Sequence, residues 1–320
     1  MSQRILITGA YGYVGGRVAQ TLSAGGAAVS LGTRQEQVSP PAWLPSAQVV
    51  HLDWRSNAAL QSVCAGTDAI VHLAAMNEVD AARDLQGALE VNGMWSLRLL
   101  EAAQAAGVRR FVYLSTAHVY GAPLTGVIDE SRVPRPAHPY AVTHKVAEDF
   151  VLAAHDSRKI EGVVLRLSNG FGAPAHPAVN RWTLLVNDLC RQAVATRTLV
   201  LQSAGLQQRD FITLEDAAQA IAHALALPQN RLGDGLFNLG GDASIRVIDM
   251  AELIAARCMV VLGFTPAIKR PEPSVGEIQA GEAQASLVYS SEKLKRTGWL
   301  PARRHAIEVD ATLTLCARLA

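Results

Sequence analysis

Residues 4–15 read Arg-Ile-Leu-Ile-Thr-Gly-Ala-Tyr-Gly-Tyr-Val-Gly, and an apolar, strand-like run here leads directly into three glycines and a helix-like segment. In a strand–turn–helix unit, Gly9 permits the tight turn and Gly12 lets the backbone approach a pyrophosphate. Gly15 lets the helix pack closely on the sheet. The pyrophosphate then lies against free N–H groups at the positive end of the helix. The stretch therefore predicts a dinucleotide site that also includes Tyr11, Tyr13 and Val14.

The same alternation of apolar runs and alanine-rich amphipathic segments continues through the first half of the chain. It predicts a doubly wound, Rossmann-type parallel sheet covered by helices on both faces, with the ligand at the carboxyl ends of the strands. The expected strands are Arg4–Thr8, Ala28–Leu31, Val49–Leu52, Ala69–Leu73, Arg110–Ser115 and Val163–Arg166. The expected helices are Gly15–Ala24, Asn57–Cys64, Gly87–Ala106 and Tyr140–Ala154.

The alternation of strand-like and helix-like segments becomes irregular beyond Asn169, where Gly and Pro interrupt regular structure before a helix-like segment at Trp182–Val194. This part is expected to form a smaller C-terminal substrate lobe. The chain is expected to return to the sheet near Arg209–Ala226 and Leu236–Leu239, so that the two lobes interleave. The predicted dinucleotide-binding domain comprises 1–168 plus about 208–242, and the substrate lobe comprises 169–207 plus 243–320.

Further motifs extend the evidence beyond the glycines. With its Gly-x-x-Gly-x-x-Gly spacing, the chain resembles the extended branch of the short-chain dehydrogenase/reductase superfamily, the nucleotide-sugar epimerases, dehydratases and reductases. The resemblance runs through most of the chain. It is carried by His72-Leu-Ala-Ala75, Leu114-Ser-Thr116, Val119-Tyr-Gly121, Pro139-Tyr-Ala-Val-Thr143, Leu165-Arg-Leu-Ser-Asn169 and Arg209-Asp-Phe-Ile212.

The second strand bears on the choice of cofactor. NAD-selective sites place an acidic residue about twenty positions beyond the glycines, whereas here the positions read Gly32, Thr33 and Arg34. A guanidinium and a hydroxyl suit a 2′-phosphate, so NADP(H) is favoured over NAD(H). The resemblance implies that Asp53 meets the adenine and that Leu73, Ala74, Ala75 and Ser115 line the cofactor. His72 is expected to be a packed core histidine as readily as a functional one.

The resemblance implies a catalytic Tyr-x-x-x-Lys pair on a helix, with a hydroxyl that holds the substrate oxygen. Tyr140 and Thr116 match these positions, but His144 stands four residues after the tyrosine and Lys145 follows it. At about 100° per residue, position i+4 lies about 40° from Tyr140 and position i+5 about 140° away. Either His144 replaces the lysine, bonding the ribose and carrying charge near neutral pH, or a π-bulge restores Lys145. We favour His144; a degenerate, inactive site is the third alternative.

The substrate end shows two departures from the family. Dehydratases place an Asp-Glu pair after the strand hydroxyl, whereas this chain has Ala117 and His118, which argues against 4,6-dehydration. The resemblance assigns the nucleotide diphosphate to Asn169 and a phosphate or ribose to Arg209. His118 is a further candidate at the substrate, where it could assist proton transfer, and a packed or solvent-facing histidine is the alternative. The segment Gln279-Ala-Gly-Glu282 lacks the arginine that the family usually has there, which weakens the case for a complete diphosphosugar ligand.

Bulk composition narrows the functional classes. The chain has 320 residues and a net charge of +1, which gives no electrostatic reason to expect nucleic acid or an anionic membrane. A core strand close to Met1 leaves no room for a signal peptide, and no apolar run reaches the roughly 20 residues of a membrane span, so a cytoplasmic protein is expected. The cysteines are widely spaced and predict buried thiols rather than a metal site. They are Cys64, Cys190, Cys258 and Cys316.

The sequence predicts an NAD(P)-dependent enzyme acting on a nucleotide diphosphosugar, most specifically a 4-keto-sugar reductase. The alternatives are a nucleotide-sugar C4 epimerase, a reductase of a non-sugar carbonyl and a non-catalytic NADP(H)-binding redox sensor. A homodimer is expected as well, because the family commonly pairs through a four-helix bundle and two segments show apolar residues that could face a partner. These residues are Leu97, Leu99 and Leu100 in Gly87–Ala106, and Val146, Phe150 and Val151 in Tyr140–Ala154.

Overall fold

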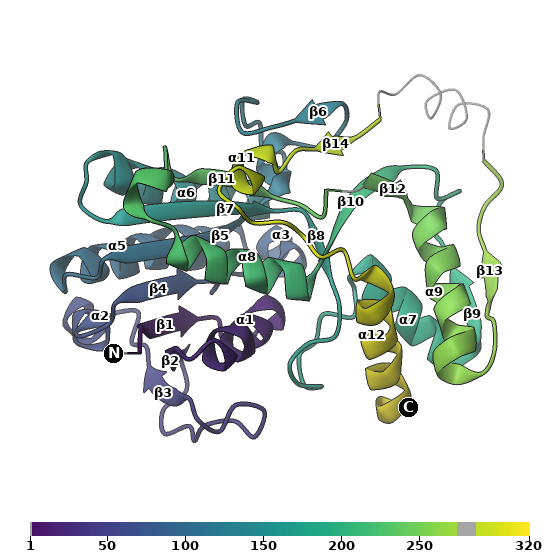
Figure 1. Ribbon diagram of the computed structural model, residues 1–320, viewed down its shortest axis with the longest axis horizontal. Helices are drawn as coiled ribbons and strands as arrows, with labels where there is room; N and C mark the ends of the chain where they lie inside the picture. The colour runs from purple at the N-terminus through teal and green to yellow at the C-terminus, as the bar shows by residue number, and fades with distance from the viewer. Residues whose placement is uncertain (1, 243, 274–285) are drawn as a thin grey trace.

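The computed structural model describes residues 2–242, 244–273 and 286–320. Its centre is a seven-stranded sheet in the order β11-β7-β5-β4-β1-β2-β3, with every neighbouring pair parallel (Figure 1). This arrangement confirms the doubly wound fold. The strands are β1 Arg4–Thr8, β2 Ala28–Thr33, β3 Gln48–His51, β4 Ala69–His72, β5 Arg110–Thr116, β7 Glu161–Leu167 and β11 Leu236–Leu239.

Helices cover both faces of this sheet, because successive side chains of a buried strand point to opposite sides. Ile5 and Ile7 of β1 pack with α1 and α8, whereas Leu6 between them packs with α2, α5 and α6. Each face therefore has its own apolar core. The helices are α1 Tyr13–Ala24, α2 Asn57–Cys64, α5 Trp95–Ala105, α6 Pro139–Asp156 and α8 Leu214–Ala226.

A smaller lobe is built on a three-stranded sheet in the order β12-β10-β8. The strand β10 (Gln208–Thr213) pairs with β8 (Asn169–Phe171) and β12 (Ser244–Arg246) rather than with the large sheet, to which the chain returns through α8 and β11. The proposed domain boundaries stay a prediction. The lobe also contains α7 Leu185–Thr196, α9 Val247–Leu262, α12 His305–Leu319 and the paired strands β9 Thr198–Val200 and β13 Ala267–Lys269. Short elements complete the chain: α3 Glu78–Arg83, α4 Leu85–Ala88, η1 Leu89–Met94, η2 Ala117–Tyr120, η3 Gln229–Arg231, α11 Glu292–Lys295, and the pair β6 Val127–Ile128 and β14 Val288–Tyr289.

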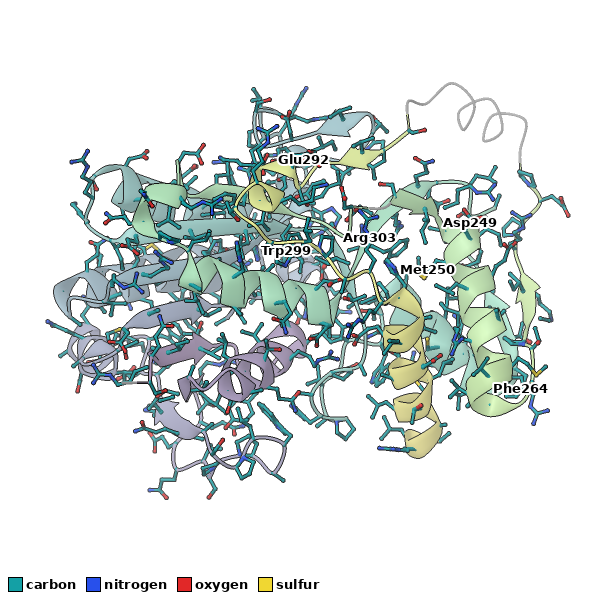
Figure 2. The ribbon with its side chains drawn as sticks, in the orientation of Figure 1. Asp249, Met250, Phe264, Glu292, Trp299 and Arg303 are labelled. Carbon is teal, nitrogen blue, oxygen red and sulfur yellow. The ribbon has the colours of Figure 1, made fainter. Side chains whose placement is uncertain are left out.

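The segment between α11 and α12 ties the lobe back to the large sheet. Trp299, labelled in Figure 2, is buried in the same core as α1 and α8. The backbone N–H groups of Ala302 and Arg303 donate to the Asp216 carboxylate on α8 at 2.6 and 3.0 Å. From α12, Glu308 accepts a hydrogen bond of 2.6 Å from Arg17 on α1. The last helix therefore holds the helix that follows the glycine loop.

The helix expected at Gly87–Ala106 is interrupted by a wider turn. Residues Leu89–Met94 form a π-helical stretch between α4 and α5, and this stretch packs against α6. Its Asn92 side chain accepts from the Met76 N–H at 2.7 Å and donates to Thr143 Oγ1 at 2.9 Å. A π-turn of the kind that often marks a functional site is thus present beside α6 and not in it.

None of the helices within the described part of the chain is long and apolar enough to cross a membrane.

Candidate active site

A cavity of about 1300 Å³ lies where the carboxyl ends of the central strands meet the small lobe. Most of the predicted site residues line it together, although they come from elements far apart in sequence. Those that line it are Gly9, Tyr11, Gly12, Tyr13, Val14, Gly15, Leu73, Ala75, Ser115, Thr116, His118, Tyr140, His144, Asn169 and Arg209. Five predicted residues are not part of its lining: Thr33, Arg34, Asp53, Ala74 and Lys145.

The glycine loop leaves the space that a dinucleotide needs. Gly9 has φ +67°, and a Cβ there would lie 2.7 Å from the Ala74 nitrogen. A Cβ at Gly15 would lie 2.1 Å from the Gly9 carbonyl oxygen. Only glycine therefore permits the turn and the close helix contact, and the N-terminus of α1 is left open to a phosphate. These residues fit an NAD(P) pyrophosphate.

The two tyrosines of the loop differ in what their side chains do. The Tyr13 hydroxyl donates to the Gly172 carbonyl at 2.8 Å and contacts Asn187, so its ring joins α1 to the small lobe. Burial of this phenol raises the pKa of Tyr13. The Tyr11 ring packs edge-on against Trp43 with centroids 6.0 Å apart. Because the phenol of Tyr13 is engaged with the small lobe, a cofactor could contact Tyr13 only through its backbone.

The residues predicted to bind the adenosine lie at the end of β2 and in the segments that follow β2 and β3. A Cβ at Gly32 would lie 2.6 Å from Leu52 Cδ1, so a larger residue there would displace its neighbour. The exposed Arg34 guanidinium lies 6.0 Å from the centroid of the Trp95 ring and has no carboxylate partner among the described residues. Thr33 Oγ1 accepts from the Gln35 N–H at 3.2 Å. Arg34 is thus an exposed cation without an acidic partner in the described part of the chain.

Asp53 is not the N-cap of the helix that follows it. That position belongs to Ser56, whose hydroxyl accepts from the Ala59 N–H at 3.2 Å. One oxygen of Asp53 accepts from the Arg55 N–H at 3.0 Å. The second carboxylate oxygen has no such partner in the described chain.

His72 is a packed core histidine, one of the two alternatives that the sequence left open. Its ring nitrogens lie 2.6 Å from Thr8 Oγ1 and 2.8 Å from Ser96 Oγ, and the ring is fully buried. Burial lowers the pKa of His72 to about 3. The Leu73 and Ala74 N–H groups also donate to Thr8 Oγ1, at 3.3 and 3.4 Å. This cluster fixes the cofactor-facing loop after β4.

Tyr140 and His144 lie one above the other on α6, with ring centroids 4.1 Å apart. Because the Tyr140 carbonyl can only accept, the 2.9 Å contact with His144 Nδ1 places the proton on Nδ1 and leaves Nε2 as an acceptor. Burial lowers the pKa of His144 to about 4. The imidazole is therefore uncharged at neutral pH, contrary to the expectation that it carries charge there.

Burial also raises the pKa of the Tyr140 phenol. The Glu78 carboxylate raises it further, whereas the Arg181 guanidinium and a hydrogen bond with Thr116 lower it. Thr116 ends β5, and its hydroxyl also accepts from the His118 N–H at 3.2 Å. The phenol and the Thr116 hydroxyl are thus placed together, as the resemblance implies for a group that moves the substrate proton.

Lys145 lies on another face of α6. Its ammonium group pairs with Asp149 one turn later, and residues 139–156 form a regular α-helix without a π-bulge. The geometry favours the His144 alternative over the Lys145 alternative.

One charged pair in the cavity, Glu78 and Arg181, was not predicted from the sequence. The Arg181 guanidinium lies 3.1 Å from the Glu78 carboxylate, and both residues line the cavity with Tyr140. Burial alone would raise the pKa of Glu78, but Arg181 holds it below its usual range. The two residues are 103 positions apart, and Arg181 stands in an irregular segment, so no spacing pattern could have linked them.

Another charged pair, Glu148 and Arg166, is buried next to Ser115. Glu148 accepts two hydrogen bonds from Arg166, at 3.0 and 2.7 Å, and a third from the Ser115 hydroxyl at 2.5 Å. Ser115 therefore directs its hydroxyl to Glu148. The pair anchors the end of β5, and with it Thr116, against α6.

The substrate end contains Asn169, Arg209 and His118. The Asn169 amide donates to the Asp210 carbonyl at 2.8 Å, and Arg209 has no carboxylate partner within ion-pair distance in the described residues. Burial, Arg209 and His138 lower the pKa of His118, which favours a neutral imidazole. The segment Gln279–Glu282 lies outside the described residues.

The comparisons with known proteins agree with this geometry. Residues 5–240 match the NAD dependent epimerase/dehydratase family. A dTDP-glucose 4,6-dehydratase of Streptomyces niveus is 29% identical over 270 residues, which cover 80% of this chain and 77% of that protein. A UDP-glucose 4-epimerase of Corynebacterium glutamicum is 29% identical over 314 residues, which cover 93% of this chain and 91% of that protein.

Among solved structures, the UDP-N-acetylglucosamine 4-epimerase from Methanobrevibacter ruminantium M1 in complex with UDP-N-acetylmuramic acid has a TM-score of 0.82 at 19% identity. The match covers 100% of this chain and 99% of that one, and it shows the shared fold. The family match spans the glycine loop, Thr116, Tyr140 and Asn169. The chain therefore belongs to the NAD-dependent epimerase/dehydratase family, within the extended short-chain dehydrogenases/reductases, and is an NAD(P)-dependent enzyme.

Proposed function

We propose that this protein is an NADP(H)-dependent reductase that acts on the keto group of a nucleotide-activated 4-keto sugar. The observation that carries the proposal is the grouping of Tyr140, Thr116 and His144 beside the glycine loop in one cavity. The residues after Thr116 are Ala117 and His118, so the acidic pair that dehydratases use to expel water is missing.

The roles follow from the chemistry of each side chain. Bound NADPH supplies the hydride. The Tyr140 O–H donates a proton to the carbonyl oxygen of the substrate, and the Thr116 hydroxyl holds that oxygen. His144 Nε2 accepts a hydrogen bond from the nicotinamide ribose and orients it. Arg34 and Thr33 bind the 2′-phosphate, and Asn169 and Arg209 bind the nucleotide diphosphate.

A C4 epimerase is the second candidate. It is favoured by the UDP-glucose 4-epimerase relative, whose match extends over nearly the whole chain. The same Tyr140 and Thr116 would serve it: the proton would leave and return at the C4 oxygen, and the hydride would leave and return at the C4 carbon.

A two-stage experiment tests the proposal. Thermal-shift measurements with nucleotide diphosphosugars, each in the presence of NADP(H) or NAD(H), identify the ligand pair that raises the melting temperature most. The oxidation of NADPH is then followed with the corresponding 4-keto sugar. Tyr140→Phe should lower kcat about 10²–10⁴-fold while leaving the Kd of NADPH unchanged, because general acid catalysis contributes on that order.

Tyr120→Phe is the matched control, since its hydroxyl donates to Asn238 and does not line the cavity. It should keep most of the turnover. If no nucleotide diphosphosugar stabilises the protein with either cofactor, the substrate class is wrong. Interconversion of nucleotide sugars without net oxidation of NADPH would instead establish the epimerase.

A further inference from the structure

Tyr140 lacks the cation that normally makes a phenol useful in acid–base catalysis. A tyrosine titrates near pH 10 and needs nearby positive charge if it is to lose its proton readily. On α6 itself, His144 is buried and bonded through Nδ1 to the Tyr140 carbonyl, and Lys145 is paired with Asp149. A permanent charge must therefore come from another element.

Arg181 is such a cation. It lies in the segment between β8 and α7, and its guanidinium reaches Glu78 at the start of α3, which packs against α6. The pair is sheltered, with 23% of the Arg181 side chain and 38% of the Glu78 side chain exposed. Asn77 fixes the Glu78 end, because its side chain caps α3 by accepting from the Val79 and Asp80 N–H groups.

We propose that Arg181 supplies the fixed positive charge that acts on the Tyr140 phenol, and that Glu78 positions this guanidinium and attenuates its charge. The proposal rests on the proposed function of Tyr140 as the proton donor. When the phenol gives its proton to the carbonyl oxygen it becomes a phenolate, and a nearby guanidinium stabilises that anion. Arginine is always protonated, so this charge does not depend on pH.

Several other groups face the phenol and have to be considered with Arg181. Glu78 opposes it, and the Thr116 hydroxyl assists it by hydrogen bonding. Two neutral imidazoles and one further phenol are also close to this site. They are His144 on α6, His118 on η2 and Tyr113 on β5. Among these groups Arg181 is the cation, so its removal changes the charge at Tyr140 directly.

The most direct test is a titration of the phenol at position 140 in the protein without cofactor or substrate. A fluorinated tyrosine, whose phenol titrates lower than that of tyrosine, is incorporated at position 140 and followed by its phenolate absorbance. Arg181→Met should raise the phenol pKa by roughly one unit and Glu78→Gln should lower it by roughly one unit, because a positive charge favours the phenolate and a negative charge disfavours it. Arg181→Lys, which keeps the charge, should restore most of the shift.

Arg191→Met is the matched control, because it removes an arginine of the same lobe from an exposed pair with Asp188. It should leave the phenol pKa unchanged. If Arg181→Met has no effect on that pKa in a folded variant, the proposal is wrong. If Arg181→Met fails to fold, Glu78→Gln and Arg181→Lys still decide the question: Glu78→Gln must lower the phenol pKa, and Arg181→Lys must leave it near the wild-type value.

The pH profile of NADPH oxidation provides the second readout, since its phenol limb should move in the same directions. A protein that turns over no keto sugar overturns the proposed function, but the titration still tests Arg181. The two failures are therefore distinguishable.

Discussion

The cofactor end and the reaction end of the cavity are built on different principles. At the cofactor end, the backbone determines the shape of the site. There is no room for a side chain at Gly9 or Gly15, and Thr8 and His72 hold the neighbouring loop in place. At the reaction end, side chains from three separate elements meet around Tyr140. The glycine turn of the first end follows from local sequence and keeps the family pattern, whereas the second end depends on contacts between residues far apart in the chain.

The largest effect that distinguishes these ends is expected on α6. His144→Ala should lower kcat on the order of 100-fold, because it removes the ring that packs against Tyr140 and the acceptor proposed for the ribose. Lys145→Ala should change kcat less than twofold, since its ammonium group is paired with Asp149. Because the pKa of His144 is lowered to about 4, kcat should show no histidine step between pH 5 and 7.

Steady-state kinetics on both variants decide this ranking. A damaging Lys145→Ala with a tolerated His144→Ala would reverse it and would contradict the contacts seen along α6.

This contrast also explains which parts of the fold and of the candidate site could be predicted from the amino-acid sequence. The sheet and the glycine turn follow from period-two apolar runs and glycine spacing, which are local signals. The i+4 geometry of a helix also made His144 the better candidate. Glu78 and Arg181 could not be found, because an ion pair across 103 residues leaves no periodic trace. The uncharged state of His144 likewise depends on burial by neighbours that sequence spacing does not identify.

The next effect concerns cofactor selectivity at the other end. Arg34→Ala should weaken NADP(H) by about 1–3 kcal/mol and leave NAD(H) nearly unchanged, since a charge-assisted bond to the 2′-phosphate is lost. Isothermal titration with both cofactors measures the difference, and Arg318→Ala, an exposed arginine on α12, serves as the control. Equal weakening of both cofactors, or a wild-type preference for NAD(H), would count against the NADP(H) assignment.

The stability of the protein in acid should depend on one buried histidine at each end of the cavity, His72 at the cofactor end and His144 at the reaction end. Histidine has a pKa near 6.5 in an unfolded chain, whereas burial lowers the pKa values of His72 and His144 to about 3 and about 4. Below pH 6.5 the unfolded state binds these protons first. As the pH falls from 6.5 to about 4, each histidine therefore lowers the free energy of unfolding by up to about 1.4 kcal/mol for every pH unit.

Urea unfolding at a series of pH values measures this slope. Replacing one of the two histidines by Asn should reduce the slope of the unfolding free energy against pH by the amount that corresponds to one bound proton. An unchanged slope would show that the histidine is charged in the folded protein.

The smallest expected effect concerns the surface behind the reaction end. Of the residues predicted to face a partner, Leu99, Leu100 and Val151 are buried against the sheet, while Leu97, Val146 and Phe150 are half-buried. Exposed Met94 and Val142 extend this apolar face. Homodimerisation stays a prediction. Val142→Asp should weaken self-association about tenfold in sedimentation equilibrium, because it puts a charge into an apolar interface.

Val260→Asp, at an exposed position on α9, should leave self-association unchanged. A wild-type protein that sediments as a monomer at micromolar concentration would rule out the dimer under those conditions.

The ion pair between Arg17 and Glu308 has a consequence for biosynthesis. The two residues are 291 positions apart, so α1 emerges from the ribosome long before the carboxylate that anchors it. Apart from Glu308, the acidic partner of Arg17 among the described residues is the more exposed Glu215. A truncated polypeptide therefore carries its first helix in a less restrained state. The contact thus couples the placement of α12 to that of α1, the helix that follows the glycine loop.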